Sequence, residues 1–129
     1  MADISTGIKA NSNFINLKPM KPDELRKEVL NLLIMDEHII SAFKTVRDQV
    51  IFSNKRIFVI NVQGVTGKKV AYFSYPYSKV QYYGIETAGL LDIDCELTVA
   101  FSNGCILQFD FKSNVNIKQI SQVISEYIL

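Results

Sequence analysis

The chain has few of the side chains that build catalytic or metal sites. It has one histidine, His38, and two cysteines, Cys95 and Cys105, among its 129 residues. A lone histidine beside Asp36 and Glu37 is typical of a surface position, and no cysteine or serine near it completes a nucleophilic site. A thiolate or imidazole metal site needs more ligands than these three residues provide. The sequence therefore predicts a protein that is not an enzyme and holds no metal or cofactor.

Long apolar runs and a positively charged leader are also missing. The chain begins Met1-Ala2-Asp3, and no stretch approaches the roughly 18 apolar residues of a membrane span. A secreted domain stapled by disulfides carries more cysteines than this chain has. We therefore expect a cytoplasmic protein.

The composition is that of one ordinary globular domain. Hydrophobic residues make up 48% of the chain and charged residues 21%. Residues 1–20 show neither helical nor strand periodicity, so they are predicted to form an arm that precedes a single domain at 21–129. The net charge of +1 gives no field that would attract nucleic acid to the whole molecule. Nucleic acid is disfavoured as a partner, and a membrane contact would be peripheral and would need a local basic patch.

A helix is expected at the start of the domain. Pro22 is followed by two acidic residues, and this order is typical of a helix start. Leu25 and Val29 then begin an apolar stripe at helical spacing, which predicts a helix over 22–34.

After this helix the pattern changes to strands. Runs rich in β-branched and aromatic residues alternate with short turn-forming clusters. Their spacing favours a mainly β fold, a seven-stranded antiparallel sandwich or barrel. The strands are predicted near 39–45, 48–53, 56–62, 69–75, 79–87, 92–101 and 105–112.

The last two strands constrain their own register. Their apolar residues share one face if Phe101 pairs with Cys105 across a three-residue loop that has Gly104 in the left-handed position. A two-residue Asn-Gly turn would place the two apolar sets on opposite faces. In the three-residue register Cys95 lies opposite Phe111, roughly 20 Å along the strand from Cys105. A disulfide is therefore excluded, and both cysteines are expected to be free thiols.

The chain ends in an amphipathic segment. Asn116 is placed to cap a helix over 116–129, with Gln119 bonding back in a capping box. This helix is expected to close an open end of the sandwich with an apolar stripe of Ile117, Ile120, Val123, Ile124, Tyr127 and Ile128.

Several short segments together resemble one known family in their order and spacing. They are Phe43-Lys44-Thr45-Val46-Arg47-Asp48, Asn54-Lys55-Arg56, Gly64-Val65-Thr66-Gly67-Lys68-Lys69, Pro76-Tyr77 and Glu86-Thr87-Ala88-Gly89. Over residues 30–129 the chain resembles the bacterial pleckstrin-homology domain family, whereas 1–20 fall outside the resemblance. The resemblance implies two antiparallel sheets packed nearly orthogonally and capped by the C-terminal helix, to which the N-terminal helix is an addition.

The resemblance also implies a non-catalytic binding or assembly module. Solved members of this family are ring-shaped homo-oligomers, so we expect the chain to assemble with itself into a ring, with a pentamer as a candidate size. An unidentified protein is the expected further partner. The helix at 22–34 has no place reserved for it in the sandwich, so the candidate oligomer contacts are Leu25 and Val29.

The alternative is a peripheral binder of an anion or a phospholipid headgroup. The segment Gly64–Lys69 lacks the glycine and hydroxyl positions of a Walker A loop, and we interpret it as a hairpin turn. Basic residues of this turn are expected to lie near those of the preceding turn. The candidate anion-binding patch is Lys55, Arg56, Lys68 and Lys69.

The family also suggests a second place for an anion. In lipid-binding pleckstrin-homology domains the phosphoinositide site lies mainly between the first two strands. Here that stretch offers Lys44 and Arg47 but adds Asp48. The lipid-binding signature of the sequence is therefore weak.

Overall fold

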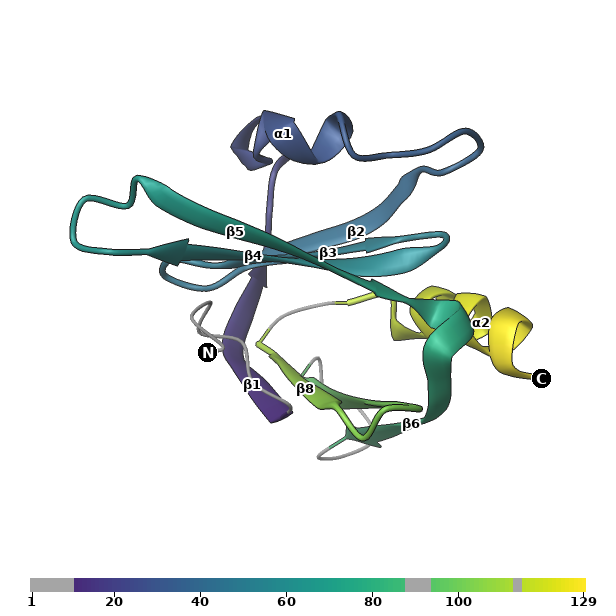
Figure 1. The fold of residues 1–129 in the computed structure, drawn as a ribbon. Helices are drawn as coiled ribbons and strands as arrows, with labels where there is room; N and C mark the ends of the chain where they lie inside the picture. The colour runs from purple at the N-terminus through teal and green to yellow at the C-terminus, as the bar shows by residue number, and fades with distance from the viewer. Residues whose placement is uncertain (1–10, 88–93, 113–114) are drawn as a thin grey trace.

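The computed structural model describes residues 11–87, 94–112 and 115–129 (Figure 1). Strands dominate these residues, which confirms the predicted mainly β class. The strands are β1 (Asn11–Pro19), β2 (Ile39–Lys44), β3 (Gln49–Ser53), β4 (Arg56–Gln63), β5 (Lys69–Pro76), β6 (Val80–Thr87), β7 (Cys95–Phe101) and β8 (Ile106–Phe111). The helices are the short η1 (Pro22–Glu24), α1 (Lys27–Leu30) and η2 (Tyr77–Lys79), and the longer α2 (Ile117–Ile128).

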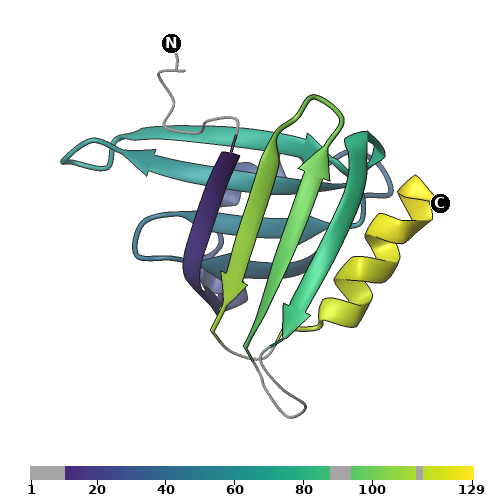
Figure 2. The same cartoon turned by 90° about the horizontal axis from the view of Figure 1, so that it is seen from below.

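The strands form one curled sheet in the order β5-β4-β3-β2-β1-β8-β7-β6. Strands β2–β5 make one layer and β6–β8 the other, and the two layers cross at a steep angle (Figure 1, Figure 2). Phenylalanine rings fill the space between the layers: Phe43 and Phe111 lie 4.7 Å apart, and Phe52 and Phe109 lie 5.4 Å apart, between ring centroids. The predicted seven strands are all present. Of the strand predicted at 92–101, residues 92 and 93 lie outside the described residues, and β7 begins at Cys95 because Asp94 is not in a strand.

Strand β1 corrects the prediction that residues 1–20 form an arm. It pairs in parallel with β8, where Phe14 lies opposite Phe109, and in an antiparallel manner with β2, where Lys18 lies opposite Lys44. Phe14 and Leu17 are buried in the core. The added strand therefore joins the two layers along one side of the fold.

An irregularity in β1 explains why the sequence did not reveal it. The pairing with β8 shifts register between Phe14 and Leu17, and Asn16 has a φ of 60°. The two buried residues are thus three positions apart, whereas a regular strand alternates every two positions. This spacing leaves neither a strand nor a helix pattern in the sequence.

The predicted helix over 22–34 is wrong in its length. Only η1 and α1 are helical, and the side chain of Gln49 lies between them. Its Nε2 donates to the backbone oxygen of Glu24 at 3.0 Å, and its Oε1 accepts from the backbone N–H of Arg26 at 3.3 Å. These bonds satisfy backbone groups that a continuous helix would pair internally, so the helix is interrupted. The side chain of Val29 packs onto the outer face of β3 and β4, against Ile51 and Phe58.

The predicted hairpin between β7 and β8 is confirmed. Phe101 donates its backbone N–H to the oxygen of Cys105 at 2.8 Å, and Gly104 has a φ of +93°. Cys95 lies opposite Phe111, and both cysteines are free and buried. Burial raises the pKa of each thiol, so neither is activated as a nucleophile.

Helix α2 closes the open side of the sheet between β5 and β6 (Figure 2). The Oδ1 atom of Asn116 accepts from the backbone N–H of Gln119 at 3.1 Å, which confirms the predicted cap. The return bond differs from a capping box, because Gln119 accepts from the Asn116 side chain rather than from its backbone. Ile120 and Ile124 are buried against the core, and the hydroxyl of Tyr83 on β6 bonds to Ser125 at 2.8 Å.

Candidate functional site

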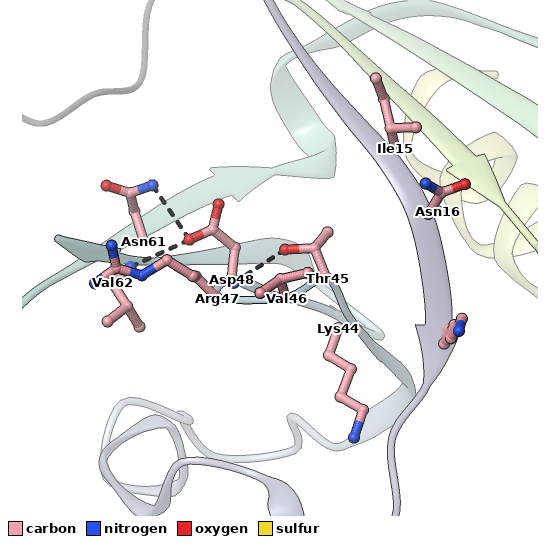
Figure 3. Close-up of a pocket in the computed structure, with 10 residues that line it drawn as sticks. Ile15, Asn16, Lys44, Thr45, Val46, Arg47, Asp48, Asn61 and Val62 are labelled. Atoms are coloured by element: carbon pink, nitrogen blue, oxygen red, sulfur yellow. Dashed lines mark hydrogen bonds between the residues drawn. The ribbon is translucent and has the colours of Figure 1, made fainter. Parts of the chain in front are cut away.

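A groove of about 740 Å³ opens between β1 and the turn that joins β2 to β3 (Figure 3). The end of β4 lies beside that turn. Basic and polar side chains from these three elements line the groove together with a few apolar ones: Ile15, Asn16, Lys18, Lys44, Thr45, Val46, Arg47, Asp48, Asn61 and Val62.

The irregularity in β1 shapes one wall of the groove. Ile15 and Asn16 occupy the positions where the register shifts, and Ile15 keeps 60% of its surface exposed. Asn16 adopts a left-handed conformation that asparagine tolerates better than most residues. Both residues line the groove, whereas a regular strand would direct one of their side chains to the core.

The β2–β3 turn forms the opposite wall and is held by its own hydrogen bonds. The backbone N–H of Thr45 donates to the oxygen of Asp48 at 2.9 Å, and the N–H of Asp48 donates to Oγ1 of Thr45 at 3.0 Å. This closed turn leaves Val46 and Arg47 at its tip, where both are exposed. Short reciprocal bonds of this kind fix a turn without help from the rest of the fold.

The single carboxylate that lines the groove is engaged by donors from β4. One oxygen of Asp48 accepts from Nδ2 of Asn61 at 3.3 Å and from the backbone N–H of Val62 at 3.2 Å (Figure 3). These donors offset part of its negative charge toward an incoming anion.

Three cations accompany that carboxylate. Lys18 is exposed on β1, and among the described residues its ammonium group has no hydrogen bond or ion pair. Lys44 forms an ion pair with Glu24 and extends away from Asp48 in Figure 3. The hydrogen bond from Lys44 is the main cause that lowers the pKa of the Glu24 carboxyl. Arg47 donates from Nη2 to the backbone oxygen of Gly64 at 2.5 Å.

That bond ties the β2–β3 turn to the β4–β5 turn. Gly64 and Gly67 have φ values of +80° and +69°, which L side chains rarely adopt. The two glycines close the turn, where the N–H of Gly67 donates to the oxygen of Gly64 at 3.4 Å. The Gly-Val-Thr-Gly-Lys-Lys segment therefore acts as a shaped hairpin turn, as predicted.

The predicted anion patch is split, which corrects the expectation that its four residues lie together. Arg56 lies opposite Pro76 and Gln63 lies opposite Lys69, so the two pairs of basic residues flank opposite ends of β4. Seven residues of strand separate these ends by roughly 23 Å. Lys68 and Lys69 lie at the end of β4 that borders the groove, whereas Lys55 and Arg56 lie at its far end.

Arg56 is moreover bound within the fold. Its Nε donates to Oε2 of Glu37 at 2.9 Å, its Nη2 donates to Oε1 of the same carboxylate at 2.9 Å, and its guanidinium lies 4.4 Å from the Phe58 ring centroid. The hydroxyl of Ser53 donates to Glu37 at 2.6 Å, and the hydroxyl of Tyr77 donates to the backbone oxygen of Ser53 at 2.7 Å. Sequence reasoning missed this network because Glu37 appeared only as a neighbour of the lone histidine.

The network also sets the protonation of its carboxyl. Burial raises the pKa of Glu37, but the hydrogen bonds from Arg56, Ser53 and the backbone of Ile34 outweigh burial and hold the pKa below its ordinary value. Burial likewise raises the pKa of the Tyr77 hydroxyl. Both groups therefore keep one protonation state near neutral pH and serve to hold the segment before β2 against the sheet.

The two candidate oligomer contacts differ in accessibility. Val29 has no exposed surface within the single chain, so a neighbouring chain cannot contact its side chain, and this part of the prediction is corrected. Leu25 is partly exposed and lines a second, more apolar groove under η1 together with Leu30 and Ile40.

Neither a metal-ligand cluster nor a membrane-spanning helix is present in the described residues. Within residues 11–87, 94–112 and 115–129, no three histidine, cysteine or acidic side chains lie close enough together to hold a metal ion. No helix in these ranges is long and apolar enough to cross a membrane.

The chain matches solved structures over most of their length. A DUF1696 family protein with a pleckstrin-homology domain from Shewanella loihica is 34% identical with a TM-score of 0.70, and the match covers 89% of this chain and 99% of that chain. A pleckstrin-homology domain from Shewanella amazonensis is 36% identical with a TM-score of 0.57, covering 85% of this chain and 90% of that chain.

Sequence relatives and a family model agree with these structures. The uncharacterized protein YjqA of Bacillus subtilis is 32% identical over 112 residues, which are 85% of this chain and 90% of YjqA. The model of the bacterial PH domain family matches residues 9–128, which include β1. The prediction that residues 1–20 fall outside the resemblance is therefore wrong from residue 9 onward. This chain belongs to the bacterial pleckstrin-homology domain family.

Proposed function

We propose that the chain is a non-catalytic binding module that holds a phosphate-bearing anion in the groove between β1 and the β2–β3 turn. The observation that carries this proposal is the set of Lys18, Lys44 and Arg47 around a groove whose one carboxylate, Asp48, already accepts two hydrogen bonds. A volume of about 740 Å³ falls in the range of small-molecule sites. The turn that forms one wall of the groove joins the first two strands of the predicted sandwich, and in lipid-binding pleckstrin-homology domains the phosphoinositide site lies mainly between these two strands.

The three cations would contribute unequally. The ammonium group of Lys18 has no partner among the described residues, so it can contact an anion without breaking any bond that the structure describes. Lys44 would share its charge with Glu24, and Arg47 has further N–H donors besides the one that bonds Gly64. A phosphate is favoured over a carboxylate because it has more oxygens that can accept from lysine and arginine donors.

Titration calorimetry with inositol hexakisphosphate tests the proposal. Lys18→Gln removes one charge and breaks no bond within the described residues, and we expect it to weaken binding about tenfold at low salt. Lys55→Gln is the matched control at the far end of β4 and should leave the affinity within about twofold. Equal losses in both variants, or no binding by the unmodified chain at low salt, would contradict the groove as an anion site.

Self-assembly is the second candidate function, and the end strand β6 favours it. No strand among the described residues pairs with its outer edge, although α2 packs beside it. Tyr82 and Ile85 on it are 54% and 41% exposed. Exposed apolar side chains on a strand that ends a sheet favour contact with another chain, either a second copy or the expected protein partner.

Light scattering on a size-exclusion column tests self-assembly. A mass near the 14.6 kDa of one chain at micromolar concentration would rule out a ring. If the mass is larger, Ile85→Lys should lower it when β6 forms the contact, and Leu25→Asp should lower it when the surface around η1 does. Val29→Asp is unsuitable because it places a charge in the core.

A further inference from the structure

A separate cavity lies at the end of β4 that is far from the groove. It has a volume of about 360 Å³ and is lined by the end of β5, the short helix η2 and the β7–β8 turn. Pro76, one of its lining residues, lies opposite Arg56, which places the cavity at the Arg56 end of β4. The cavity shares no lining residue with the groove, so it can hold a ligand independently of the groove.

Hydrogen bonds hold the walls of this cavity in place. The backbone N–H of Ser102 in the β7–β8 turn donates to the oxygen of Lys79 in η2 at 2.9 Å. Within the turn, Oδ1 of Asn103 accepts from the backbone N–H of Cys105 at 3.0 Å. A cavity whose walls are already bonded to each other needs little ordering when it takes a ligand.

Aromatic rings line the cavity together with two polar groups that have no hydrogen bond. The rings of Tyr75 and Phe101 lie 5.4 Å apart between centroids. Cys105 is only 7% exposed, and among the described residues neither its thiol nor the Tyr75 hydroxyl has a hydrogen-bond partner. Burial, and next the nearby Cys105 thiol, raise the pKa of the Tyr75 hydroxyl to about 12, so it stays protonated and can donate to a ligand. Buried polar groups are normally hydrogen-bonded, and a ligand in the cavity would supply the missing partner.

The charge of the cavity comes from one lysine. Lys79 is exposed, and in the described part of the chain its ammonium group has no hydrogen bond or ion pair. Of the described residues that line the cavity, none is acidic, whereas Asp48 lines the groove. A lone cation beside two rings and a hydroxyl donor suits a ligand with a flat apolar body and one negative group. The volume is near the lower limit of small-molecule sites, so the ligand must be small.

We propose that this cavity binds a small aromatic carboxylate, with its ring against Tyr75 and Phe101 and its carboxylate toward Lys79. An inositol phosphate is disfavoured because it has no apolar body to cover the two rings and finds one lysine there. A cationic ring is disfavoured because it would meet the ammonium group of Lys79. The site is separate from the anion-binding groove, so neither proposal depends on the other.

Indole-3-acetate is a direct probe of this site, because the chain contains no tryptophan and the emission of the probe is free of protein indole. We expect its fluorescence anisotropy to rise on titration with the protein. Tryptamine, which carries a positive group on the same ring, should bind about tenfold more weakly. Lys79→Gln should weaken the binding of indole-3-acetate about fivefold, and Lys118→Gln, an exposed lysine of α2, should leave it within about twofold. Equal affinities for the two probes, or equal affinities of the two variants, would overturn the site.

The two free thiols show where the probe binds. Cys105 lines the cavity, whereas Cys95 lies at the other end of β7 and is almost equally buried, at 8% exposure against 7%. At a probe concentration about ten times its Kd, only about a tenth of the chains have an empty cavity, so alkylation of Cys105 by N-ethylmaleimide should slow about tenfold. The rate at Cys95, followed in the same samples by peptide mass spectrometry, should not change. Slowing of both thiols, or of neither, would overturn the assignment to this cavity. Inositol hexakisphosphate should leave the rate at Cys105 unchanged, and protection of Cys105 by this phosphate would equally contradict the proposal.

Discussion

The two ends of β4 carry similar basic residues in different surroundings. At one end Arg56 bonds a buried carboxylate and the backbone of Leu32, and stacks on Phe58. At the other end Lys68 and Lys69 are exposed in a turn and have no ion pair among the described residues. The first end holds the chain between α1 and β2 to the sheet, and the second leaves its charge to the solvent.

The difference shows that a cluster of cations in the sequence does not by itself define a binding site. What decides is whether the fold contains an acidic partner for each cation. Glu37 pairs with Arg56, whereas Lys18 in the groove and the lysines of the β4–β5 turn have no acidic partner in the part of the chain that the structure describes. Variants at the two ends should therefore change different properties, the free energy of unfolding at one end and the affinity for anions at the other.

The largest effect is expected at Arg56. Arg56→Ala leaves the buried carboxylate of Glu37 without its ion pair, and breaking a buried pair of this kind costs about 3 kcal/mol of unfolding free energy. Urea denaturation followed by far-UV circular dichroism measures this loss. Lys55→Ala, one residue earlier, should change the free energy of unfolding by less than about 0.5 kcal/mol. Similar values for the two variants would mean that the network does not stabilise the fold.

The contribution of the Arg56 end of β4 to stability should also depend on pH. The folded-state pKa of Glu37 lies below its ordinary value of 4.5, so its contribution to stability is fully present above that value and is lost as the pH falls below it. In Arg56→Ala the contribution is already missing. The difference in unfolding free energy between the unmodified chain and this variant should therefore shrink between about pH 6 and about pH 3. Urea titrations across this range test the sign, and a difference that grows in acid would contradict it.

The sequence predicted the elements whose residues follow regular local rules. The predicted strands agree with β2 to β6 and β8 within about one residue at each described end, and the turn at Gly104 was predicted from the faces of Phe101 and Cys105. Helix α2 and its cap at Asn116 followed from helical spacing. In each case the signal lies within a few residues of the element that it predicts.

Prediction from the sequence failed where the local structure depends on an irregular backbone or on residues far along the chain. The irregularity at Asn16 hides β1, and the side chain of Gln49, far along the chain, interrupts the expected helix. Lys44, Arg47 and Asp48 of the groove were named from the sequence, but Lys18 was missed because it lies in the unrecognised strand. The split of the basic patch could have been foreseen, since successive turns of antiparallel strands lie at opposite ends of the strand between them.

A moderate effect is expected in the turn at the free end of β4. Gly67 has a φ of +69°, and an added Cβ would meet Val62 at 3.5 Å and Arg47 at 4.0 Å, which are ordinary contacts. The strain of Gly67→Ala is therefore conformational and should cost about 1 kcal/mol of unfolding free energy. Gly84→Ala on β6 is the control, because its φ is not positive and its Cβ would meet nothing within 4 Å. We expect this control to be neutral or slightly stabilising by urea denaturation.

The smallest effect on stability is expected at the lysines of the same turn. Lys68→Glu combined with Lys69→Glu removes no described partner, so the free energy of unfolding should change by less than about 0.5 kcal/mol. The reversal nevertheless changes the charge beside the groove by four units, and inositol hexakisphosphate should then bind the chain at least tenfold more weakly at low salt. Lys55→Glu should leave this affinity within about twofold, because it lies at the end of β4 far from the groove. Titration calorimetry at low and high salt measures both affinities. Unchanged affinity in the double reversal would mean that Lys68 and Lys69 take no part in anion binding and that the groove cations alone account for it.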